Sequence, residues 1–459
     1  MKRVAALAAL ALLSGCAAVG EGPQASSVAL PSGIAYAPDP AARAPLTALL
    51  PNEDPAFRAL LAAIDADAPD LQVALARVQA ARAALRAAGA ERAPNINASG
   101  SASRDRSTRN NVIDFPGFDT TTSNFSLAID SSWDLDLFGR LRATQRAAAL
   151  RLNAAEADAR AVRLALVSDI ARAAVDYRTA QARLDIVTQD LADADALVAL
   201  TEARARAGLV PALDLVRAEG LEAAALAQRG PAEADLANAL GRLVTLTARS
   251  GTEVAAAFAA SPEPAGLHPL PQTGLPSDLL RQRPDIVAAE ARLAAANQEI
   301  AAAAAARFPQ ISINAALGLA ALAFGDLFSS DSLTASLGGN IAAPLLDFGR
   351  IGAQIDAREA DAAEAFAVYR QTVFAAIGEG ETALGSLAAQ RGRVAALEAQ
   401  QRIEADALAL SMQRYRMGLS DFLGVIDAQR QLNTTRQSLA SARGAAKQAE
   451  IAIYRSFGG

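Results

Sequence analysis

The sequence predicts a mainly α-helical protein with a few membrane strands, built from two tandem copies of one helix–strand–strand–helix–helix unit. Three observations support this fold class. The composition is rich in alanine and contains only 4% aromatic residues, which is typical of long helices rather than of a thick aromatic core. Short motifs recur in the same order in the two halves of the 459-residue chain. Each half also contains one very long stretch without a Gly-Pro turn signal.

Charge and rare residue types argue against several classes of function. The net charge of −6 disfavours a nucleic-acid binder, which carries a basic patch or stripe. A single cysteine excludes an internal disulfide framework, and a single histidine argues against a His-based metal or catalytic centre. We therefore expect no catalytic residues, no metal site and no cofactor apart from a covalent lipid.

Residues 1–15 resemble the signal peptide of a bacterial lipoprotein. The apolar stretch Val4 to Leu13 follows a short basic region and is too short to span a bilayer, which takes about 20 residues. It ends in a segment that resembles a lipobox, whose Cys16 would carry the lipid and begin the mature chain. Residues 16–64 are then expected to form a lipidated extended segment and a short helix. Ala17 favours the outer membrane; an uncleaved signal with a buried thiol is the alternative.

The two copies span residues 65–250 and 280–459, with a Pro-rich linker at 251–279 between them. Their common ancestry is visible in four pairs of short motifs that occur in the same order. The pairs are Pro69-Asp70-Leu71 with Pro284-Asp285-Ile286, Ala93-Pro94-Asn95-Ile96 with Phe308-Pro309-Gln310-Ile311, Phe138-Gly139-Arg140 with Phe348-Gly349-Arg350, and Arg206-Ala207-Gly208-Leu209 with Arg416-Met417-Gly418-Leu419.

Each copy contains two stretches in which apolar and polar residues alternate, which predicts strands. Phe125, Leu127 and Ile129 share one side of such a stretch, and Ser126 and Asp130 share the other. A strand with one side in lipid and the other in water requires this pattern, although a half-exposed soluble sheet gives it as well. The strands are expected at about 95–104 and 123–136 in the first copy and at about 310–322 and 332–345 in the second.

Long helices are expected over about 139–206 and about 349–416. At 1.5 Å per residue, the first would be about 100 Å long. Ile170, Tyr177 and Leu184 recur every seven residues, which predicts coiled-coil packing. Glycines in the repeated turn motifs would end both helices, and shorter helices would return from there, the second of them capped by Asp421.

Four strands cannot close a membrane barrel, because such barrels begin at about eight strands and an open edge in lipid is prohibitive. If the strands lie in a membrane, several chains must share one barrel. Two chains would give eight strands and three would give twelve. A wide duct favours three, because eight strands enclose little more than their own side chains.

Six segments of the chain resemble the outer-membrane factor family, the TolC-like exit ducts, in its lipoprotein and NodT/RND-type branch. The resemblance implies a homotrimer with a shared 12-stranded barrel in outer-membrane lipid and a periplasmic α-barrel of coiled-coil helices. It also implies docking to a periplasmic adaptor protein and to an inner-membrane pump of the RND type. The segments are TrpAspLeuAspLeuPheGlyArg at 133–140, GlnArgProAspIleValAlaAlaGlu at 282–290, ArgPheProGlnIle at 307–311, ArgTyrArgMetGlyLeu at 414–419, ValIleAspAlaGlnArg at 425–430 and GluIleAlaIleTyrArg at 450–455.

The resemblance further implies a periplasmic gate in the second copy. Asp427 matches the family's constriction aspartate, and it shares one helix face with Leu423 and Arg430. Around a threefold axis these residues would form one apolar ring and two charged rings. Tyr415 matches a tyrosine that ties the inner helix to its neighbours in the closed state. The alternatives are an Asp427–Arg430 surface pair worth a few tenths of a kcal/mol, and a packing role for Tyr415.

Other residues receive roles at the ends of the helices. Trp133 suits a membrane interface, or alternatively core packing, and Gly139 and Gly349 are expected at turns between strand and helix. The adaptor-docking turns are expected to contain Arg206, Gly208 and Leu209 in the first copy and Arg416, Gly418 and Leu419 in the second.

The expected function is an outer-membrane exit duct that passively conducts drugs, dyes and other toxic small molecules. A duct for type I protein secretion keeps the same fold with another cargo. A periplasmic coiled-coil scaffold without a pore keeps the helices but predicts no lipid-facing strands. An enzyme is disfavoured, because no paired carboxylates, nucleophile–base set or ligand cluster stands out in the sequence.

Overall fold

The computed structural model describes residues 46–106, 108, 121–261 and 282–459. Cys16, the signal segment and most of the Pro-rich linker lie outside these ranges. The chain divides into two compact units. The strand unit contains Arg77–Glu156 and Ala288–Arg370, and the helical unit contains Ala157–Val287, Gln371–Gly459 and the described part of Ala29–Ala76.

The strand unit contains one antiparallel sheet in the order β1-β2-β3-β4. The bounds of its strands lie within a few residues of the stretches in which apolar and polar residues alternate. Two short 3-10 turns, η4 (Phe324–Asp326) and η5 (Ser330–Ser332), follow β3. Each copy thus contributes one hairpin to the sheet. The strands are β1 (Asn95–Arg106), β2 (Thr121–Asp134), β3 (Gln310–Ala321) and β4 (Leu333–Ala342).

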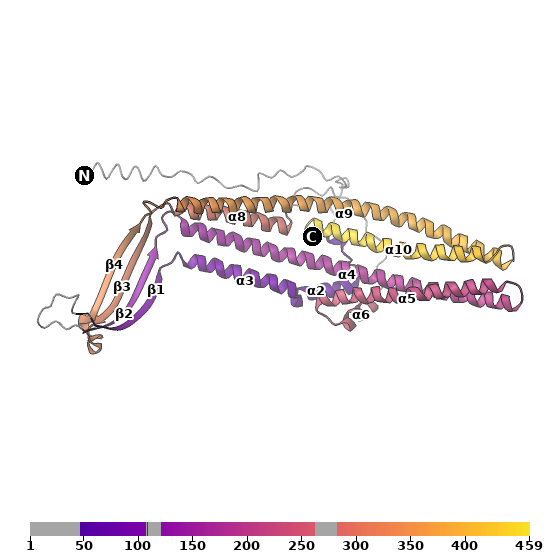
Figure 1. The fold of residues 1–459 in the computed structure, drawn as a ribbon, viewed down its shortest axis with the longest axis horizontal. Helices are drawn as coiled ribbons and strands as arrows, with labels where there is room; N and C mark the ends of the chain where they lie inside the picture. Colours follow the sequence, from indigo (N-terminus) through magenta and orange to yellow (C-terminus); the bar gives the residue numbers. More distant parts are fainter. Residues whose placement is uncertain (1–45, 107, 109–120, 262–281) are drawn as a thin grey trace. The chain divides into compact units, whose positions relative to one another are not determined.

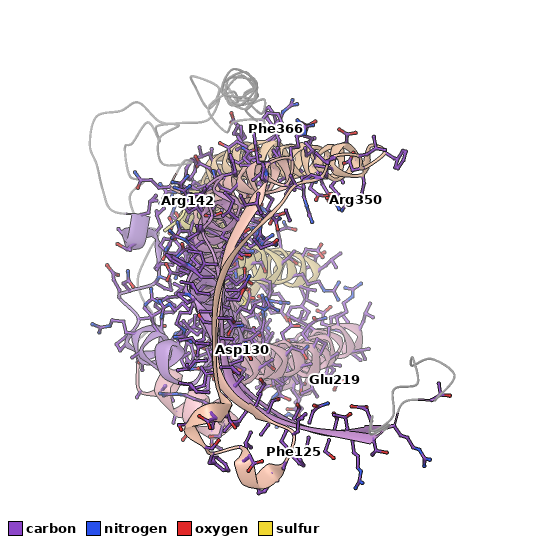
Figure 2. The ribbon with its side chains drawn as sticks, turned by 90° about the vertical axis from the view of Figure 1, so that its left-hand side faces the viewer. Phe125, Asp130, Arg142, Glu219, Arg350 and Phe366 are labelled. Atoms are coloured by element: carbon purple, nitrogen blue, oxygen red, sulfur yellow. The ribbon has the colours of Figure 1, made fainter. Side chains whose placement is uncertain are left out.

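The register of the strands gives the sheet one apolar and one polar face. Leu127 on β2 lies opposite Gly100 on β1 and Leu319 on β3, so these residues share a face. Phe125 and Asp130, labelled on β2 in Figure 2, belong to opposite faces because their numbers differ in parity. The apolar face includes Phe125, Leu127, Ile129, Ile313, Leu317, Leu319, Leu333, Leu337 and Ile341, and the polar face includes Asn97, Ser99, Asp130, Ser132, Asn314 and Asn340.

The chain alone does not bury this apolar face. Leu337 is 80% exposed and Ile341 is 70% exposed. A contiguous exposed apolar surface of this kind marks contact with a membrane or a partner. The opposite face is held by polar contacts, among them the hydrogen bond that Ser99 Oγ donates to Asp130 Oδ2 over 3.0 Å.

The two hairpins have equivalent registers. Gly100 lies opposite Leu127 in the first hairpin, and their counterparts in the duplicated sequence, Ala315 and Leu337, lie opposite each other in the second. The duplication read from short motifs is therefore preserved at the level of single residue pairs.

Two very long helices confirm the expected helix–strand–strand–helix–helix order. They are α4 (Arg140–Arg206) and α9 (Arg350–Arg416), each of 67 residues and visible in magenta and orange in Figure 1. Within the described ranges, no helix combines the length and the apolar character needed to cross a membrane. The shorter helices are α3 (Pro69–Ala90) and α8 (Pro284–Ala305) before the strands, and α5 (Ala212–Thr247) and α10 (Leu423–Ser456) after the long helices.

Two expectations for the helix ends were wrong. The predicted linker begins with a helix, α6 (Gly251–Ala259), because Ser250 and Glu253 form a reciprocal capping box that starts it. Asp421 does not occupy the N-cap position of α10, which belongs to Phe422. The Asp421 carboxylate still accepts a 3.4 Å hydrogen bond from the Gly424 N–H, so it serves the first turn from one position further out.

A buried arginine joins three elements of the helical unit. Arg178 on α4 lies 3.0 Å from the Asp54 carboxylate, and both side chains are almost fully buried. Asp54 also caps α2 (Pro55–Asp67) by accepting a hydrogen bond from Ala56 N–H. Arg178 donates to the carbonyl oxygens of Phe258 and Ser261 and lies over the Phe258 ring. One guanidinium thus fixes the start of α2 and the end of α6 to α4.

Candidate functional site

The two turns that follow the long helices have the same backbone structure. Gly208 and Gly418 adopt φ values of 70° and 72°, in the left-handed region that glycine reaches without strain. The next residue donates its N–H to the carbonyl five positions earlier, from Leu209 to Arg204 and from Leu419 to Arg414, over 2.9 and 2.8 Å. This pattern is a Schellman motif, which ends a helix by satisfying its last carbonyls.

The turns hold basic and apolar side chains at the surface. Leu209 and Leu419 are 67% and 63% exposed. Arg206 and Arg416 are exposed as well, as are both glycines. The six residues predicted to dock an adaptor therefore lie at the surface of the helical unit, three on each turn.

Tyr415 lies in a buried contact between the two turns of the chain. Its ring is almost fully buried, with the guanidinium carbon of Arg204 4.6 Å from the ring centre and the Phe422 ring 5.1 Å away. Arg204 also donates a 3.2 Å hydrogen bond to the Tyr415 carbonyl oxygen. Burial raises the pKa of the Tyr415 phenol, and the charge of Arg204 opposes that shift. The tyrosine thus ties the second-copy turn to the first-copy helix α4.

The Tyr415 hydroxyl accounts for little of this contact. Among the described residues, Tyr415 Oη forms no hydrogen bond of good geometry, although the nearby Thr201 side chain interacts with it and lowers its pKa. The surrounding apolar cluster supplies the packing instead. Its buried members besides Tyr415 are Ala194, Leu197, Ala218, Leu221, Phe422, Val425 and Ile426.

The three predicted gate residues share the exposed face of α10. Leu423 is 41% exposed, and Asp427 and Arg430 are exposed too. Val425 and Ile426, which lie between Leu423 and Asp427 in sequence, are buried on the other face. Asp427 and Arg430 form no ion pair with each other in the described part of the chain, so the surface-pair interpretation is not realised there.

The first copy has a different charge at the corresponding position. Arg217 is the counterpart of Asp427, and its guanidinium lies 3.8 Å from the carboxylate of Asp214 on the same helix. Leu213 is the counterpart of Leu423 and is 55% exposed. Only the second copy therefore presents an exposed carboxylate at this position of the returning helix.

Polar side chains join α4 to α10 along the helical unit. Arg436 lies 3.3 Å from Asp190 and 3.2 Å from Asp193. Gln448 donates hydrogen bonds to the Arg172 carbonyl and to the Asp176 carboxylate. These contacts connect the first copy to the second, and heptad spacing gave no sign of them.

The contacts between α4 and α10 form a polar seam, and Asp190 has the most strongly shifted pKa among its acids. Its side chain is 8% exposed, and burial raises its pKa to about 6, against the charge of Arg436. The nearby Asp193 carboxylate raises it further. A carboxyl group with this pKa changes its charge at mildly acidic pH.

The predicted interface residues lie where the strands meet the helices. Trp133 is 38% exposed, and its indole Nε1 donates a 3.0 Å hydrogen bond to the Arg92 carbonyl. Gly139 and Gly349 adopt φ values of 79° and 88° immediately before α4 and α9. Asp136 accepts hydrogen bonds from the first N–H groups of α4, and Asp347 does the same for α9. Both glycines are turn residues that a side chain would strain.

The described residues contain no candidate metal site. Across the described ranges, no group of three or more His, Cys, Asp or Glu side chains has the arrangement that could hold a metal ion. Cys16, the predicted lipidation site, lies outside those ranges.

Comparison with known proteins identifies the family. The sequence profile of the outer membrane efflux protein family matches residues 60–249 and 275–459. The chain belongs to this family. The solvent efflux pump outer membrane protein SrpC of Pseudomonas putida is 32% identical over 465 residues, covering 98% of this chain and 97% of SrpC. The pyoverdine export outer membrane protein OpmQ of Pseudomonas aeruginosa is 32% identical, covering 85% of this chain and 82% of OpmQ.

A solved structure agrees with the sequence relatives. The outer-membrane channel OprN superposes with a TM-score of 0.85 at 29% identity, covering 95% of this chain and 98% of OprN. The chain is thus an outer-membrane efflux protein with the fold of an outer-membrane channel. The gate, docking and interface roles of single residues remain predictions.

Proposed function

We propose that three copies of this chain form the exit duct of a tripartite efflux system, joined to a periplasmic adaptor and an inner-membrane pump. One observation carries the proposal: the sheet has a continuous apolar face and a polar face, and each of its two edge strands, β1 and β4, pairs with only one strand among the described residues. Because an open edge in lipid is prohibitive, β4 of one protomer would pair with β1 of the next. The apolar face would then contact lipid and the polar face would line water.

The duplication predicts the register of this pairing between protomers. Leu127 on β2 lies opposite Leu319 on β3, at the junction of the two copies. Their counterparts in the other copy are Leu337 on β4 and Arg104 on β1. We expect Leu337 to lie opposite Arg104 of the neighbouring protomer, with the rest of the pairing following from that residue pair.

An exposed aromatic residue indicates that a neighbouring protomer packs at the same junction. Phe138 of the first copy stacks on Phe308 with 4.8 Å between ring centres. Phe348, the second-copy counterpart of Phe138, is 92% exposed. In a closed ring of protomers, Phe348 would pack against the start of β1 in the next chain.

The exposed face of α10 would form the gate of the duct. Around a threefold axis, Leu423, Asp427 and Arg430 would give an apolar ring and two charged rings that narrow the lumen. Tyr415 and Arg204 would hold the second-copy helices against α4 in the closed state. We infer that opening requires this contact to loosen when the adaptor engages the turns.

The remaining assignments concern anchoring and docking. Cys16 would carry a covalent lipid that secures the N-terminus of the mature chain in the outer membrane. The paired turns, with exposed Leu209 and Leu419 beside basic side chains, would meet the adaptor. Exposed leucines flanked by arginines suit a partner surface that is partly apolar and partly acidic.

We propose small molecules as the cargo, in the class of drugs, dyes and other toxic compounds. SrpC is named for solvents and OpmQ for pyoverdine, so related ducts are named for chemically different cargo. A wide water-filled duct needs few specific contacts, and the choice of cargo would fall to the pump.

A deletion strain that lacks redundant ducts tests this function. Dye accumulation and the set of secreted proteins are measured with and without a plasmid copy of the gene. Dye retention with normal secretion, reversed by the plasmid, is the expected result. Normal dye export with a missing secreted protein would keep the fold and move the function to type I secretion.

A further inference from the structure

The apolar face of the sheet ends in two arginines on β1. Ala102 lies opposite Phe125 on β2, and the same alternation brings Arg104 and Arg106 onto this face. Both arginines are exposed. A charged side chain in the middle of a lipid-facing surface destabilises a membrane barrel, whereas one near the membrane border costs little. Two arginines at the end of the apolar face therefore indicate a membrane border.

Within the paired strands, neither arginine has an acidic neighbour on its own face. Their β2 partners are Ser123 and Thr121. The proposed register with the next protomer adds Leu337 and Ala335, which are equally uncharged. Asp105 lies between them in sequence but on the opposite face, where it accepts a hydrogen bond from Ser103. Among residues 46–106, 108, 121–261 and 282–459, no acidic side chain forms an ion pair with either guanidinium.

The distance along the strand puts these arginines at a membrane border. From Trp133 to Ser123, β2 advances about 33 Å at about 3.3 Å per residue. A tilt of about 40° reduces this to about 25 Å of height, which equals the apolar band of membrane barrels. Trp133 adjoins the helices, so Arg104 and Arg106 lie at the far border, beside the outer leaflet.

Aromatic side chains lie close to this end of the sheet. Phe324, in the connection between β3 and β4, packs edge-on against Phe125 with ring centres 5.6 Å apart, and Phe328 packs against Phe324. Phe324 and Phe328 are 63% and 69% exposed. Such rings accommodate acyl chains just below the headgroup level, where aromatic residues gather in membrane proteins.

We propose that Arg104 and Arg106 bind the phosphate groups of the outer-leaflet glycolipid, lipopolysaccharide, whose acyl chains rest on the adjoining apolar face. The proposal rests on the proposed function, which puts the sheet in the outer membrane. A guanidinium matches phosphate with two parallel, charge-assisted hydrogen bonds. Two such groups, two residues apart on one strand, face the same lipid headgroup region.

The test compares two double variants of the full-length protein. Arg104→Gln/Arg106→Gln removes the proposed site. Arg146→Gln/Arg307→Gln removes the same charge from two exposed arginines on helical and connecting segments of the same unit. Binding of purified lipopolysaccharide, of its dephosphorylated form and of phosphatidylglycerol is measured in detergent by native mass spectrometry.

We expect the wild type and the control to retain phosphorylated lipopolysaccharide, and the site variant to bind it about thirtyfold more weakly. Dephosphorylated lipid should bind all three proteins equally weakly. Equal binding of phosphorylated lipopolysaccharide by both double variants would overturn the proposal. Binding of phosphatidylglycerol by the wild type as tightly as lipopolysaccharide would overturn it as well. A site variant that loses its trimer in lipid-free detergent would also overturn it and would assign the arginines to the neighbouring protomer.

A separate measurement keeps the two proposals apart. Planar-bilayer conductance of the wild type tests whether the sheet forms a pore at all. A conducting wild type whose lipid binding is insensitive to the site variant would overturn the lipid site alone. If neither the wild type nor Tyr415→Ala, which removes the proposed closed-state contact, conducts after insertion, the proposed function would be overturned.

Discussion

At the scale of single residues, the charge of Asp427 is the feature that separates the second copy from the first. Its carboxylate is exposed on α10, whereas the corresponding Arg217 is paired with Asp214. Three such carboxylates around an axis would attract cations and repel anions. We therefore expect the proposed gate role of Asp427 to depend on its charge rather than on its packing.

Replacing Asp427 by asparagine should lower the cation selectivity of the pore, because it removes the ring of carboxylates that attracts cations and repels anions. Asp427→Glu keeps the charge and should keep the selectivity. Reversal potentials in planar bilayers with a salt gradient measure both effects. Unchanged selectivity and current in Asp427→Asn would remove this residue from the gate.

Two substitutions at Tyr415 separate packing from hydrogen bonding. Tyr415→Phe should leave stability and the closed state nearly unchanged, because the hydroxyl forms no hydrogen bond of good geometry among the described residues and only a weak interaction with Thr201 is lost. Tyr415→Ala should destabilise the turns by about 3 kcal/mol or more, since it opens a cavity beside Phe422. Thermal unfolding and single-channel current measure these effects. A large rise in current from Tyr415→Phe would instead indicate a bond from the hydroxyl to a neighbouring protomer.

At the scale of helices and strands, buried charge fixes the ends of short helices to the long one. Arg178 and Asp54 form such a pair, and Arg183 and Asp235 form an exposed pair from the same helix α4. Arg178→Met should lower the free energy of unfolding by about 3–5 kcal/mol, because it leaves the Asp54 carboxylate buried without its partner.

Arg183→Met is the matched control for this prediction. Its pair is more than a third exposed on both sides, so its loss should change stability by less than about 1 kcal/mol. Denaturant unfolding and proteolysis near α2 and α6 measure the difference. Equal effects of the two substitutions would show that the buried pair contributes no more than the exposed one.

The seam between α4 and α10 should respond to pH through Asp190. Its pKa is raised from 3.8 to about 6 in the folded state, so the folded protein binds the proton more tightly than the unfolded chain. The stabilisation is complete below about pH 4 and is lost as the pH rises through about 6. The loss amounts to at most about 3 kcal/mol per protomer.

Asp190→Asn removes this titration while keeping the shape of the side chain. Its melting temperature relative to the wild type should therefore rise between about pH 4 and about pH 7. Arg436 and Asp193, the charged groups facing Asp190, are kept in both proteins. A difference in melting temperature that does not depend on pH would contradict this assignment.

Local signals predicted the elements well. Alternation located the strands, and the repeated glycines located both ends of α4 and α9. The helix α6 was missed although its signal was present, because Ser250 and Glu253 have the spacing of a capping box. The Pro-rich composition of the following segment obscured it. The predicted N-cap of α10 was wrong by one residue. An aspartate side chain can accept a hydrogen bond from the first turn of a helix from the position before the N-cap, as Asp421 does.

Contacts between distant elements could not be predicted in this way. The Arg178–Asp54 pair, the Arg204–Tyr415 contact and the Asp190–Arg436 pair each join residues far apart in sequence. Spacing along one helix gives the face of a side chain but not its partner on another helix. The candidate gate was located only because the family resemblance supplied Asp427 and Tyr415.

At the scale of the whole molecule, the four-stranded sheet does not close into a barrel by itself. Its apolar face is exposed, and no further described strand pairs with the outer side of β1 or β4. The duplication predicts how neighbouring chains close the sheet. Ile129 lies opposite Leu317, and the counterparts of these residues in the other copy are Gly339 and Ala102. Gly339 should therefore lie opposite Ala102 of the next chain. A shared barrel is therefore the central claim of this account.

The most direct test is cysteine cross-linking of Gly339→Cys/Ala102→Cys in the membrane, followed by denaturing electrophoresis without reductant. The account predicts a covalent trimer that reverts to monomers on reduction, and little cross-linking of the shifted pair Gly339→Cys/Ser101→Cys. A covalent dimer as the end product, or preferential cross-linking of the shifted pair, would contradict three chains sharing one barrel in the register set by the duplication.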